Sequence, residues 1–145
     1  MTNTEAFIAL NMIDGVGPVR LRKLLEYFGE ASAILRARKE SLVAVPGIGE
    51  EIACAISDWE NRIDLSGEIK RIEEYGCKVF CLEDEEYPAL LKQIYDPPVV
   101  LYVMGNILPK DKNAIAVVGS RLTTHYGIES ARRLAYQLAF AGVTV

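Results

Sequence analysis

The residues best placed to do chemistry lie in one short stretch, AIAVVGSRLTTHYG at residues 114–127, where a polar turn follows an apolar run. Ser120, Thr123 and Thr124 supply hydroxyl groups. Arg121 supplies a planar guanidinium that fits the oxygens of a phosphate. A helix predicted after the turn adds free backbone N–H groups at its N-terminus. Together these groups predict phosphate binding, without the glycine pattern of a dinucleotide site or the lysine of a P-loop.

The same turn leaves a structural interpretation open. Gly119 permits a ligand to approach the backbone closely, but the hydroxyl side chains would also cap a helix and leave Arg121 as an ordinary surface residue. Tyr126 either packs against the sheet or stacks on a base. His125 has no nucleophile or carboxylate placed to make it a catalytic base, so we predict no catalytic residue here.

The elements that must hold this turn are predicted from the apolar pattern on either side of it. The run AIAVVG at 114–119 predicts a buried strand, and VTV at 143–145 predicts the start of another. Between them an apolar stripe predicts a helix that ends at Gly142. Strand, turn, helix and strand open a doubly wound, Rossmann-like α/β sheet, which binds ligands beyond the carboxyl ends of its strands. The stripe consists of Ile128, Ala131, Leu134, Ala135 and Leu138.

The first third of the chain contains an internal repeat of two glycine turns. Residues 13–25 read IDGVGPVRLRKLL and residues 45–56 read VPGIGEEIACAI. Each has an apolar residue, a tight Gly-apolar-Gly turn and an amphipathic helix, a pattern that resembles the tandem helix-hairpin-helix (SAM-like) domain. Glycines allow the tight turn, and the N–H groups of the next helix can then face a phosphate.

The two hairpins differ in charge. Basic residues follow the first turn, whereas residues 50–51 after the second are both glutamate, which suits a helix N-terminus but repels phosphate. DNA contact is therefore predicted for the first hairpin rather than the second. The competing interpretation is that both hairpins only pack helices together or contact another protein. The candidate DNA contacts are Gly15, Gly17, Arg20 and Lys23.

The middle of the chain predicts a helix and two strands. A helix ending at Gly76 precedes a short strand, CKVFCL at 77–82, and VVLYVMGN at 99–106 gives a second strand. The pair Ser66-Gly67 breaks the preceding pattern and suggests a domain boundary. We therefore expect an α-helical hairpin domain at residues 1–65 and an incomplete Rossmann-like domain at residues 66–145.

Composition indicates a globular protein with an uneven charge. Half of the 145 residues are apolar, a quarter are charged, and the net charge is −4. This acidity argues against wholesale adhesion to nucleic acid, but residues 113–145 carry 3 basic groups and 1 acidic group, which leaves room for a local site. Neither a secretory signal nor an apolar run long enough to span a bilayer is present, so we expect a location inside the cell.

The three cysteines predict neither disulfides nor a metal site. Cys54, Cys77 and Cys81 are odd in number, and a reducing compartment disfavours disulfides. His125 is the single histidine and lies far from them in the sequence, so no zinc-ligand set is complete. We predict buried free thiols and no bound metal.

At this point a family resemblance is evident. The segment EEYPALLKQIYDPPVVLYVMGN at 85–106, the motif VVGSR at 117–121 and the tandem hairpins are similar to the DNA-processing protein A (DprA/Smf) family over nearly the whole chain. The resemblance implies a cytoplasmic, non-enzymatic protein that needs no cofactor and binds single-stranded DNA. It further implies a homodimer formed through the Rossmann-like domain, and loading of a RecA-type recombinase onto DNA taken up in natural transformation.

The resemblance also carries over a set of DNA-binding positions. The family's Rossmann-like domain continues well past this turn, so we expect the chain to be an N-terminal fragment of a longer protein. Two other functions stay open: a nucleotide-binding enzyme of the lysine-decarboxylase-like phosphoribohydrolase type, and a protein-interaction role for residues 1–65. The family positions in this sequence are Gly119, Ser120 and Arg121, with Thr124, Tyr126 and Gly127 matching the rest of the motif.

Overall fold

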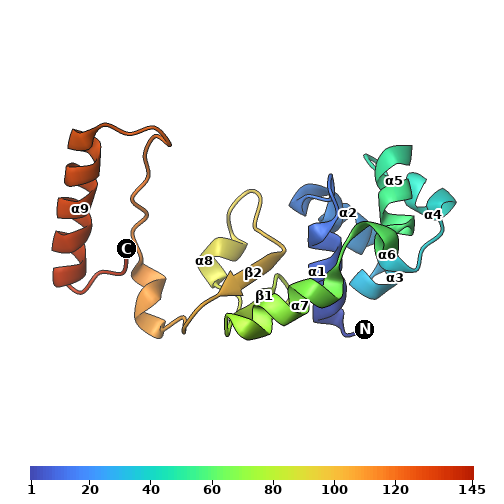
Figure 1. The fold of residues 1–145 in the computed structure, drawn as a ribbon, viewed down its shortest axis with the longest axis horizontal. Coiled ribbons are helices and arrows are strands. Elements are labelled where there is room, and N and C mark those ends of the chain that lie inside the picture. Colours follow the sequence, from blue (N-terminus) through green and yellow to red (C-terminus); the bar gives the residue numbers. More distant parts are fainter. The chain divides into compact units, whose positions relative to one another are not determined.

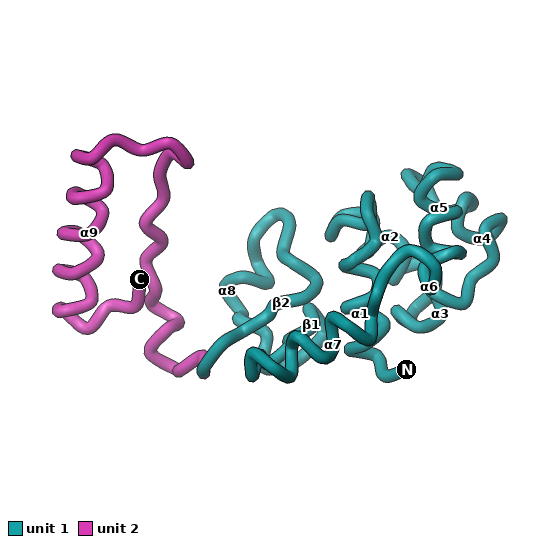
Figure 2. Tube along the Cα trace, viewed as in Figure 1, with its two compact units in different colours: residues 1–105 teal, residues 106–145 magenta.

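The computed structural model describes residues 1–145, which divide into two compact units, unit 1 (residues 1–105) and unit 2 (residues 106–145) (Figures 1 and 2). Unit 1 holds eight α-helices and two strands, and unit 2 holds a 3₁₀-helix and one α-helix. The elements are α1 (Asn3–Met12), α2 (Pro18–Phe28), α3 (Ala31–Leu35), α4 (Lys39–Val43), α5 (Glu50–Ser57), α6 (Trp59–Arg62), α7 (Leu65–Glu74), β1 (Lys78–Cys81), α8 (Ala89–Lys92), β2 (Val100–Val103), η1 (Pro109–Asn113) and α9 (His125–Phe140).

The first hairpin begins with a helix whose start is fixed by a capping box. Glu5 N–H donates to Thr2 Oγ1 at 3.2 Å, and Thr2 N–H donates to Glu5 Oε2 at 2.7 Å. This reciprocal pair satisfies two of the N–H groups that every helix leaves free at its start. Helix α1 then places Phe7 and Leu10 fully inside the core. The expected tandem helix-hairpin-helix arrangement is confirmed from this helix through α5.

Both glycine turns adopt the same backbone conformation. Gly15 has φ of 83° and Gly47 has φ of 91°, a region that side-chain-bearing residues rarely adopt. Each turn is closed by a backbone hydrogen bond of 3.0 Å, which Val16 N–H donates in the first turn and Ile48 N–H donates in the second. Glycine at the first position of each turn is therefore required by the backbone conformation.

The two hairpins also bury matching side chains. Corresponding residues are separated by one constant interval in the sequence, and every one of them has at most 5% of its surface exposed. The repeated sequence thus produces two copies of one helix–turn–helix packed around a shared core. The buried pairs are Leu10 with Leu42, Ile13 with Val45, Val16 with Ile48, Leu21 with Ala53, and Leu24 with Ile56.

A two-stranded antiparallel sheet completes unit 1. Strands β1 and β2 pair from Lys78 opposite Val103 to Cys81 opposite Val100, so both strands expected in this segment are confirmed. Helix α1 contacts both strands as well as α3 and α7. Cys81, Val99 and Val100 join the same buried cluster as the hairpin residues. The sheet therefore packs on the hairpin core rather than standing apart from it.

Helix α7 begins at Leu65, close to the expected domain boundary. Asp64 Oδ1 accepts a hydrogen bond of 2.9 Å from Gly67 N–H and caps the helix. A Cβ atom at Gly67 would collide with the Asp64 carboxylate, so glycine here makes room for the cap. The pair Ser66-Gly67 thus starts a helix instead of a linker, while the compact units separate after residue 105. The boundary between residues 65 and 66 stays a prediction.

Unit 2 confirms the predicted helix but not the predicted strands. Helix α9 forms as a 16-residue helix, whereas residues 114–119 and 143–145 form no strand. Ile115 N–H donates to Thr144 O at 2.8 Å, and this is the one backbone hydrogen bond between the two segments. A ladder needs repeated bonds of this kind, so the segments run as irregular chain. A strand at 114–119 is therefore a wrong prediction for this structure.

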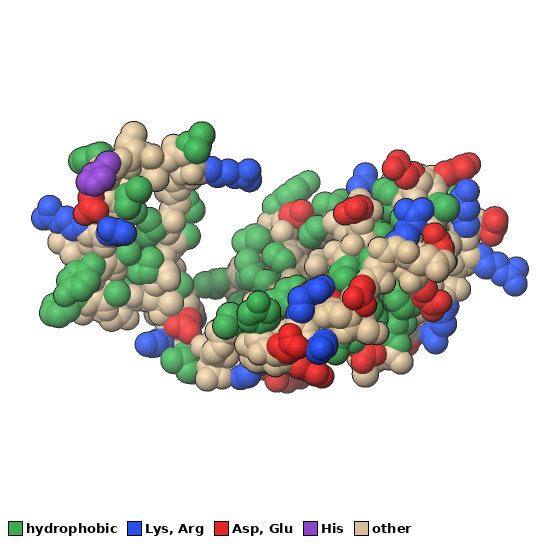
Figure 3. Space-filling view, viewed as in Figure 1, with side chains coloured by type: hydrophobic (Ala, Val, Ile, Leu, Met, Phe, Trp, Pro, Cys, Tyr) green, Lys and Arg blue, Asp and Glu red, His purple; other side chains and the backbone are tan.

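The surface of unit 2 is strongly apolar. None of its residues is buried, and side chains of α9 such as Tyr126, Tyr136 and Phe140 are more than 70% exposed. Hydrophobic atoms accordingly lie at the surface of residues 106–145 in Figure 3. No helix of the structure combines the length and the apolar composition needed to cross a membrane.

Candidate functional site

The turn predicted to bind phosphate is held by the cap of α9. Thr124 Oγ1 accepts a hydrogen bond of 3.1 Å from Gly127 N–H, so the capping interpretation is confirmed for this threonine. Ser120 Oγ donates to Leu122 O at 3.0 Å. Arg121 is exposed and makes no hydrogen bond or ion pair. The guanidinium is therefore available to a ligand, while the two hydroxyl groups already fix the shape of the turn.

The remaining residues of this turn are distributed around the start of α9. A Cβ atom at Gly127 would collide with Thr123 Oγ1 and lie 3.5 Å from Thr124 Oγ1, so this glycine lets the cap close. No heavy atom lies within 4 Å of the corresponding position at Gly119, which leaves that backbone open to solvent. Tyr126 is 82% exposed and packs against no sheet. Its ring is thus accessible beside the capped helix.

The four candidate residues of the first hairpin lie around its turn. Arg20 Nη1 donates to Gly15 O at 2.8 Å, and Lys23 Nζ donates to Pro46 O of the second hairpin at 3.3 Å. Gly17 is the N-cap of α2 and offers no side-chain cap. A cleft of about 470 Å³ brings Gly17, Arg20 and Lys23 together with the second turn. Lys23 therefore joins the two hairpins in addition to contributing positive charge.

The second hairpin is closed to anions by its own carboxylates. Glu50 and Glu51 occupy the first turn of α5, where they complement the positive end of the helix. Glu50 Oε2 also lies 3.4 Å from Lys39 Nζ. A phosphate approaching this helix would meet two negative charges. The sequence predicted a basic first hairpin and an acidic second hairpin, and the charges at the N-termini of α2 and α5 agree with this difference.

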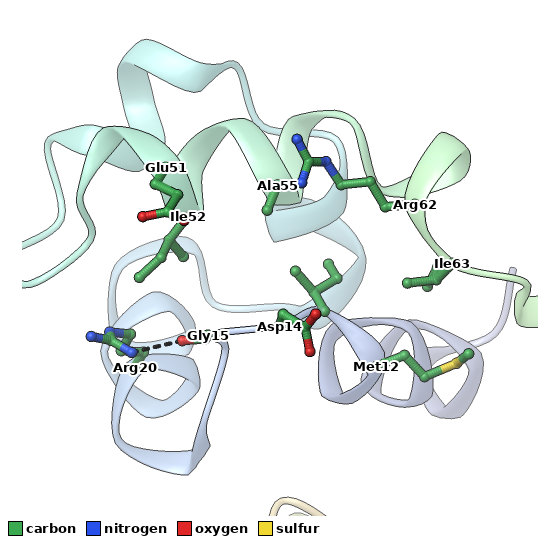
Figure 4. A pocket seen from close by; sticks show the side chains of 10 residues that line it. Met12, Asp14, Gly15, Arg20, Glu51, Ile52, Ala55, Arg62 and Ile63 are labelled. Carbon is green, nitrogen blue, oxygen red and sulfur yellow. Dashed lines mark hydrogen bonds between the residues drawn. The ribbon is translucent and has the colours of Figure 1, made fainter.

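A second cleft of about 570 Å³ lies between the hairpins (Figure 4). Ile52 of α5 reaches toward Gly15, where its Cγ1 lies 3.5 Å from the position of a glycine Cβ. Arg20 of α2 and Glu51 of α5 bring opposite charges to this cleft from different helices, and Arg62 is paired with Asp58 at 3.4 Å. The mixed charge and the apolar floor make this cleft a packing seam between the hairpins rather than an anion site.

The sequence reasoning missed a contact that ties the first hairpin to the loop after α8. Arg22 Nη2 lies 3.2 Å from Asp96 Oδ1 and donates to Tyr95 O at 3.4 Å. The residues are far apart in the sequence, and no periodic pattern signals such a pair. The contact places the DPP segment, residues 96–98, beside α2 within unit 1 (Figure 1).

The prediction that all three cysteine thiols are buried is partly wrong. Cys81 is buried, Cys77 is half-buried and Cys54 is exposed. Cys54 lies on the outer face of α5, between the inward positions Ala53 and Ala55–Ile56. Its place in an apolar run suggested burial, but the helix turns its side chain away from the core.

These features define a class of protein: a tandem helix-hairpin-helix module followed by a small sheet and a capped, arginine-bearing turn. Comparison with known families agrees. Residues 7–57 match the family model described as "SAM-like Helix-hairpin-helix tandem", and residues 78–145 match the model described as "DNA recombination-mediator protein A". The second half of the chain is thus similar to this family of DNA-processing proteins, known as DprA or Smf.

Individual relatives support the same assignment. Protein Smf of Synechocystis is 27% identical over 151 residues, which cover the whole chain and 38% of that protein. Protein Smf of Borreliella burgdorferi is 38% identical over 76 residues, covering 52% of the chain and 24% of that protein. UvrABC system protein C of Coxiella burnetii is 47% identical over 49 residues, 34% of the chain and 8% of that protein. No solved structure matches the chain.

Proposed function

We propose that this chain binds single-stranded DNA as part of a DNA-processing protein, with Arg121 contacting a phosphate. The observation that carries the proposal is the exposed, unpaired guanidinium of Arg121 next to the capped start of α9. Guanidinium groups bind phosphate oxygens through charge-assisted hydrogen bonds, and the helix start adds a favourable dipole. Similarity to the DprA/Smf family supports DNA as the source of that phosphate.

The surroundings of Arg121 complete the proposed site. Ser120 and Thr124 keep the turn in shape, Gly119 leaves its backbone open, and Tyr126 offers an exposed ring to a base. Each of these groups tolerates any base sequence, because phosphates and ring faces are common to all nucleotides. The site is therefore proposed to bind single strands without sequence preference, and to act by binding rather than by catalysis.

Further parts of the proposal concern the larger protein. Residues 66–145 are proposed as the opening of a Rossmann-like DNA-binding domain, in which α9 follows the turn at Arg121. The protein acts in the cytoplasm as a homodimer and loads a RecA-type recombinase onto single strands during natural transformation. The chain spans 38% of the Synechocystis relative, so these activities belong to the whole protein. The phosphoribohydrolase alternative finds no support in the family matches.

Replacement of Arg121 by alanine is expected to weaken single-strand binding by about 1–3 kcal/mol, the scale of a hydrogen bond to a charged group. The dependence of affinity on salt should also become shallower by roughly one phosphate contact. Fluorescence anisotropy with a labelled oligothymidylate, repeated over a series of salt concentrations, measures both quantities on the full chain.

Arg133→Ala provides the matched control. Arg133 is an exposed arginine in α9 and lies beyond the first turn of the helix. Its replacement by alanine removes the same charge from the same unit as Arg121→Ala does. Its loss should leave affinity within about twofold, because a distant surface charge adds only a screened contribution. Equal affinity of the Arg121→Ala chain and the unmodified chain would remove Arg121 from the proposed site.

A further inference from the structure

One groove of unit 1 combines positive charge with exposed aromatic rings. Two adjoining clefts, of about 470 and 300 Å³, share Lys23 and run along α2. We call this surface the α2 groove. Its α2 wall carries Val19, Lys23 and Tyr27, its opposite wall carries Pro46 and Gly47, and Asp96 lies at one end.

The electrostatics of the α2 groove favour an anionic chain. Arg20 and Lys23 line it, and Arg22 neutralises Asp96 at a distance of 3.2 Å. Lys23 is oriented by its hydrogen bond to Pro46 O and keeps further N–H donors for a ligand. Glu26, at the Tyr27 end, is the single acidic side chain of the groove without an ion-pair partner.

Two exposed tyrosines adjoin the α2 groove: Tyr27 lines it, and Tyr95 directly precedes Asp96, which also lines it. Tyr27 is 58% exposed, and its ring rests edge-on against Phe28 with centroids 4.9 Å apart. Tyr95 is 93% exposed, and the hydrogen bond from Arg22 Nη2 to its carbonyl holds its loop beside α2. Water-exposed aromatic rings held by their own backbone and neighbours suit the stacking of unpaired bases.

We propose that the α2 groove is a second single-strand-binding surface, where Arg20 and Lys23 contact phosphates and Tyr27 and Tyr95 stack on bases. The proposal rests on the proposed function, since it takes DNA as the ligand of the protein. It adds a surface on unit 1 that does not include the turn at Arg121. Stacking needs unpaired bases, so the groove selects single strands over duplex. The corresponding surface of the second hairpin is excluded by Glu50 and Glu51.

Tyrosine substitutions test the stacking. Tyr27→Ala and Tyr95→Ala are each expected to weaken binding of oligothymidylate to the full chain by about fivefold or more, because a stacked base contributes substantially to single-strand affinity. Tyr27→Phe and Tyr95→Phe should restore most of the affinity, since the ring face is kept. Tyr75→Ala, at a tyrosine that is 68% exposed outside the groove, is the control and should bind as the unmodified chain does.

A charge substitution tests the phosphate path without disturbing the fold. Val19 is 44% exposed in the first turn of α2, where a carboxylate is favourable to the helix. Val19→Glu copies the charge that Glu51 gives to the second hairpin, so it should preserve the melting temperature and reduce single-strand affinity severalfold. Val43→Glu, at a 39% exposed valine outside the α2 groove, is the charge-matched control.

The outcomes separate this proposal from the proposed function. Failure of the unmodified chain to bind any single strand overturns both. Unchanged affinity in Tyr27→Ala, Tyr95→Ala and Val19→Glu, together with weaker binding in Arg121→Ala, overturns the α2 groove alone. Equal losses for Val19→Glu and Val43→Glu would show a general charge effect and also overturn it. Losses confined to the groove variants, reversed by phenylalanine, support it.

Discussion

Phe7→Ala is expected to destabilise unit 1 by about 3–5 kcal/mol, the usual cost of emptying a large buried site. Phe7 has no exposed surface, and it lies on α1, the helix that contacts α3, α7 and both strands. A cavity at this position therefore loosens the hairpins and the sheet together. The expectation depends on unit 1 unfolding as one cooperative body rather than as two domains divided at residue 65.

Two local probes distinguish these possibilities during urea unfolding. Trp59 fluorescence reports on the end of the second hairpin, and amide exchange at Phe80 reports on β1. Both should shift to lower urea by the same amount in Phe7→Ala, with a smaller common shift in Phe7→Leu. Tyr75→Ala, at an exposed tyrosine, should change stability by less than about 0.5 kcal/mol. A shift confined to one probe would show that the hairpins and sheet unfold separately.

The sequence predicted the hairpins and the strands of unit 1, but not the packing that joins them. The glycine repeat predicted both hairpins, because Gly15 and Gly47 need the same rare backbone conformation and the apolar spacing follows helix period. The apolar runs around Phe80 and Leu101 predicted the strands. Their packing on α1 was not predictable, because contacts between distant elements leave no periodic trace in one sequence.

The failures have equally specific causes. The apolar run at 114–119 has the composition of a buried strand, yet one hydrogen bond from Ile115 gives it no ladder. Cys54 lies in an apolar run, yet helix geometry directs it outward. Composition describes what a segment prefers, whereas burial and pairing depend on the neighbours that the rest of the structure supplies.

The candidate site shows the same division between local and distant information. Thr124 could be predicted as a cap, since its hydroxyl is followed at helical spacing by Gly127. The pairing of Arg22 with Asp96 could not be predicted, because it depends on which side chains come close in space. Local interactions such as helix caps can thus be predicted from the sequence, whereas ion pairs between distant residues depend on the fold.

A buried thiol makes the stability of unit 1 sensitive to alkaline pH. Cys81 is 1% exposed, and its burial, reinforced by the nearby Asp84 carboxylate, raises the pKa of the thiol from 9.0 to about 11. The same Asp84 carboxylate also holds the backbone of Cys81, because Cys81 N–H donates to Asp84 Oδ2 at 2.6 Å. The folded protein therefore keeps the neutral thiol at a pH where the unfolded chain has already lost the proton.

The sign of the effect follows from this difference. Below pH 9 the thiol is neutral in both states, and between pH 9 and about 11 only the unfolded state gains from ionisation. Stability should fall through this window by up to about 2–3 kcal/mol relative to neutral pH. Cys81→Ala should have lower stability at pH 8 because of lost packing, but a shallower decline from pH 8 to pH 11 measured by urea unfolding.

The exposed thiol supplies the comparison that isolates burial. Cys54→Ala removes a cysteine whose side chain is exposed, so its decline with pH should match that of the unmodified chain. Tyr102, whose pKa burial and Glu68 raise from 10.0 to about 12, adds a second decline that begins near pH 10. The difference in the decline of stability with pH between Cys81→Ala and Cys54→Ala therefore measures the effect of burial on the pKa of the Cys81 thiol. An identical decline in both would mean that the thiol is solvated in the folded protein and that the sheet does not close over the core.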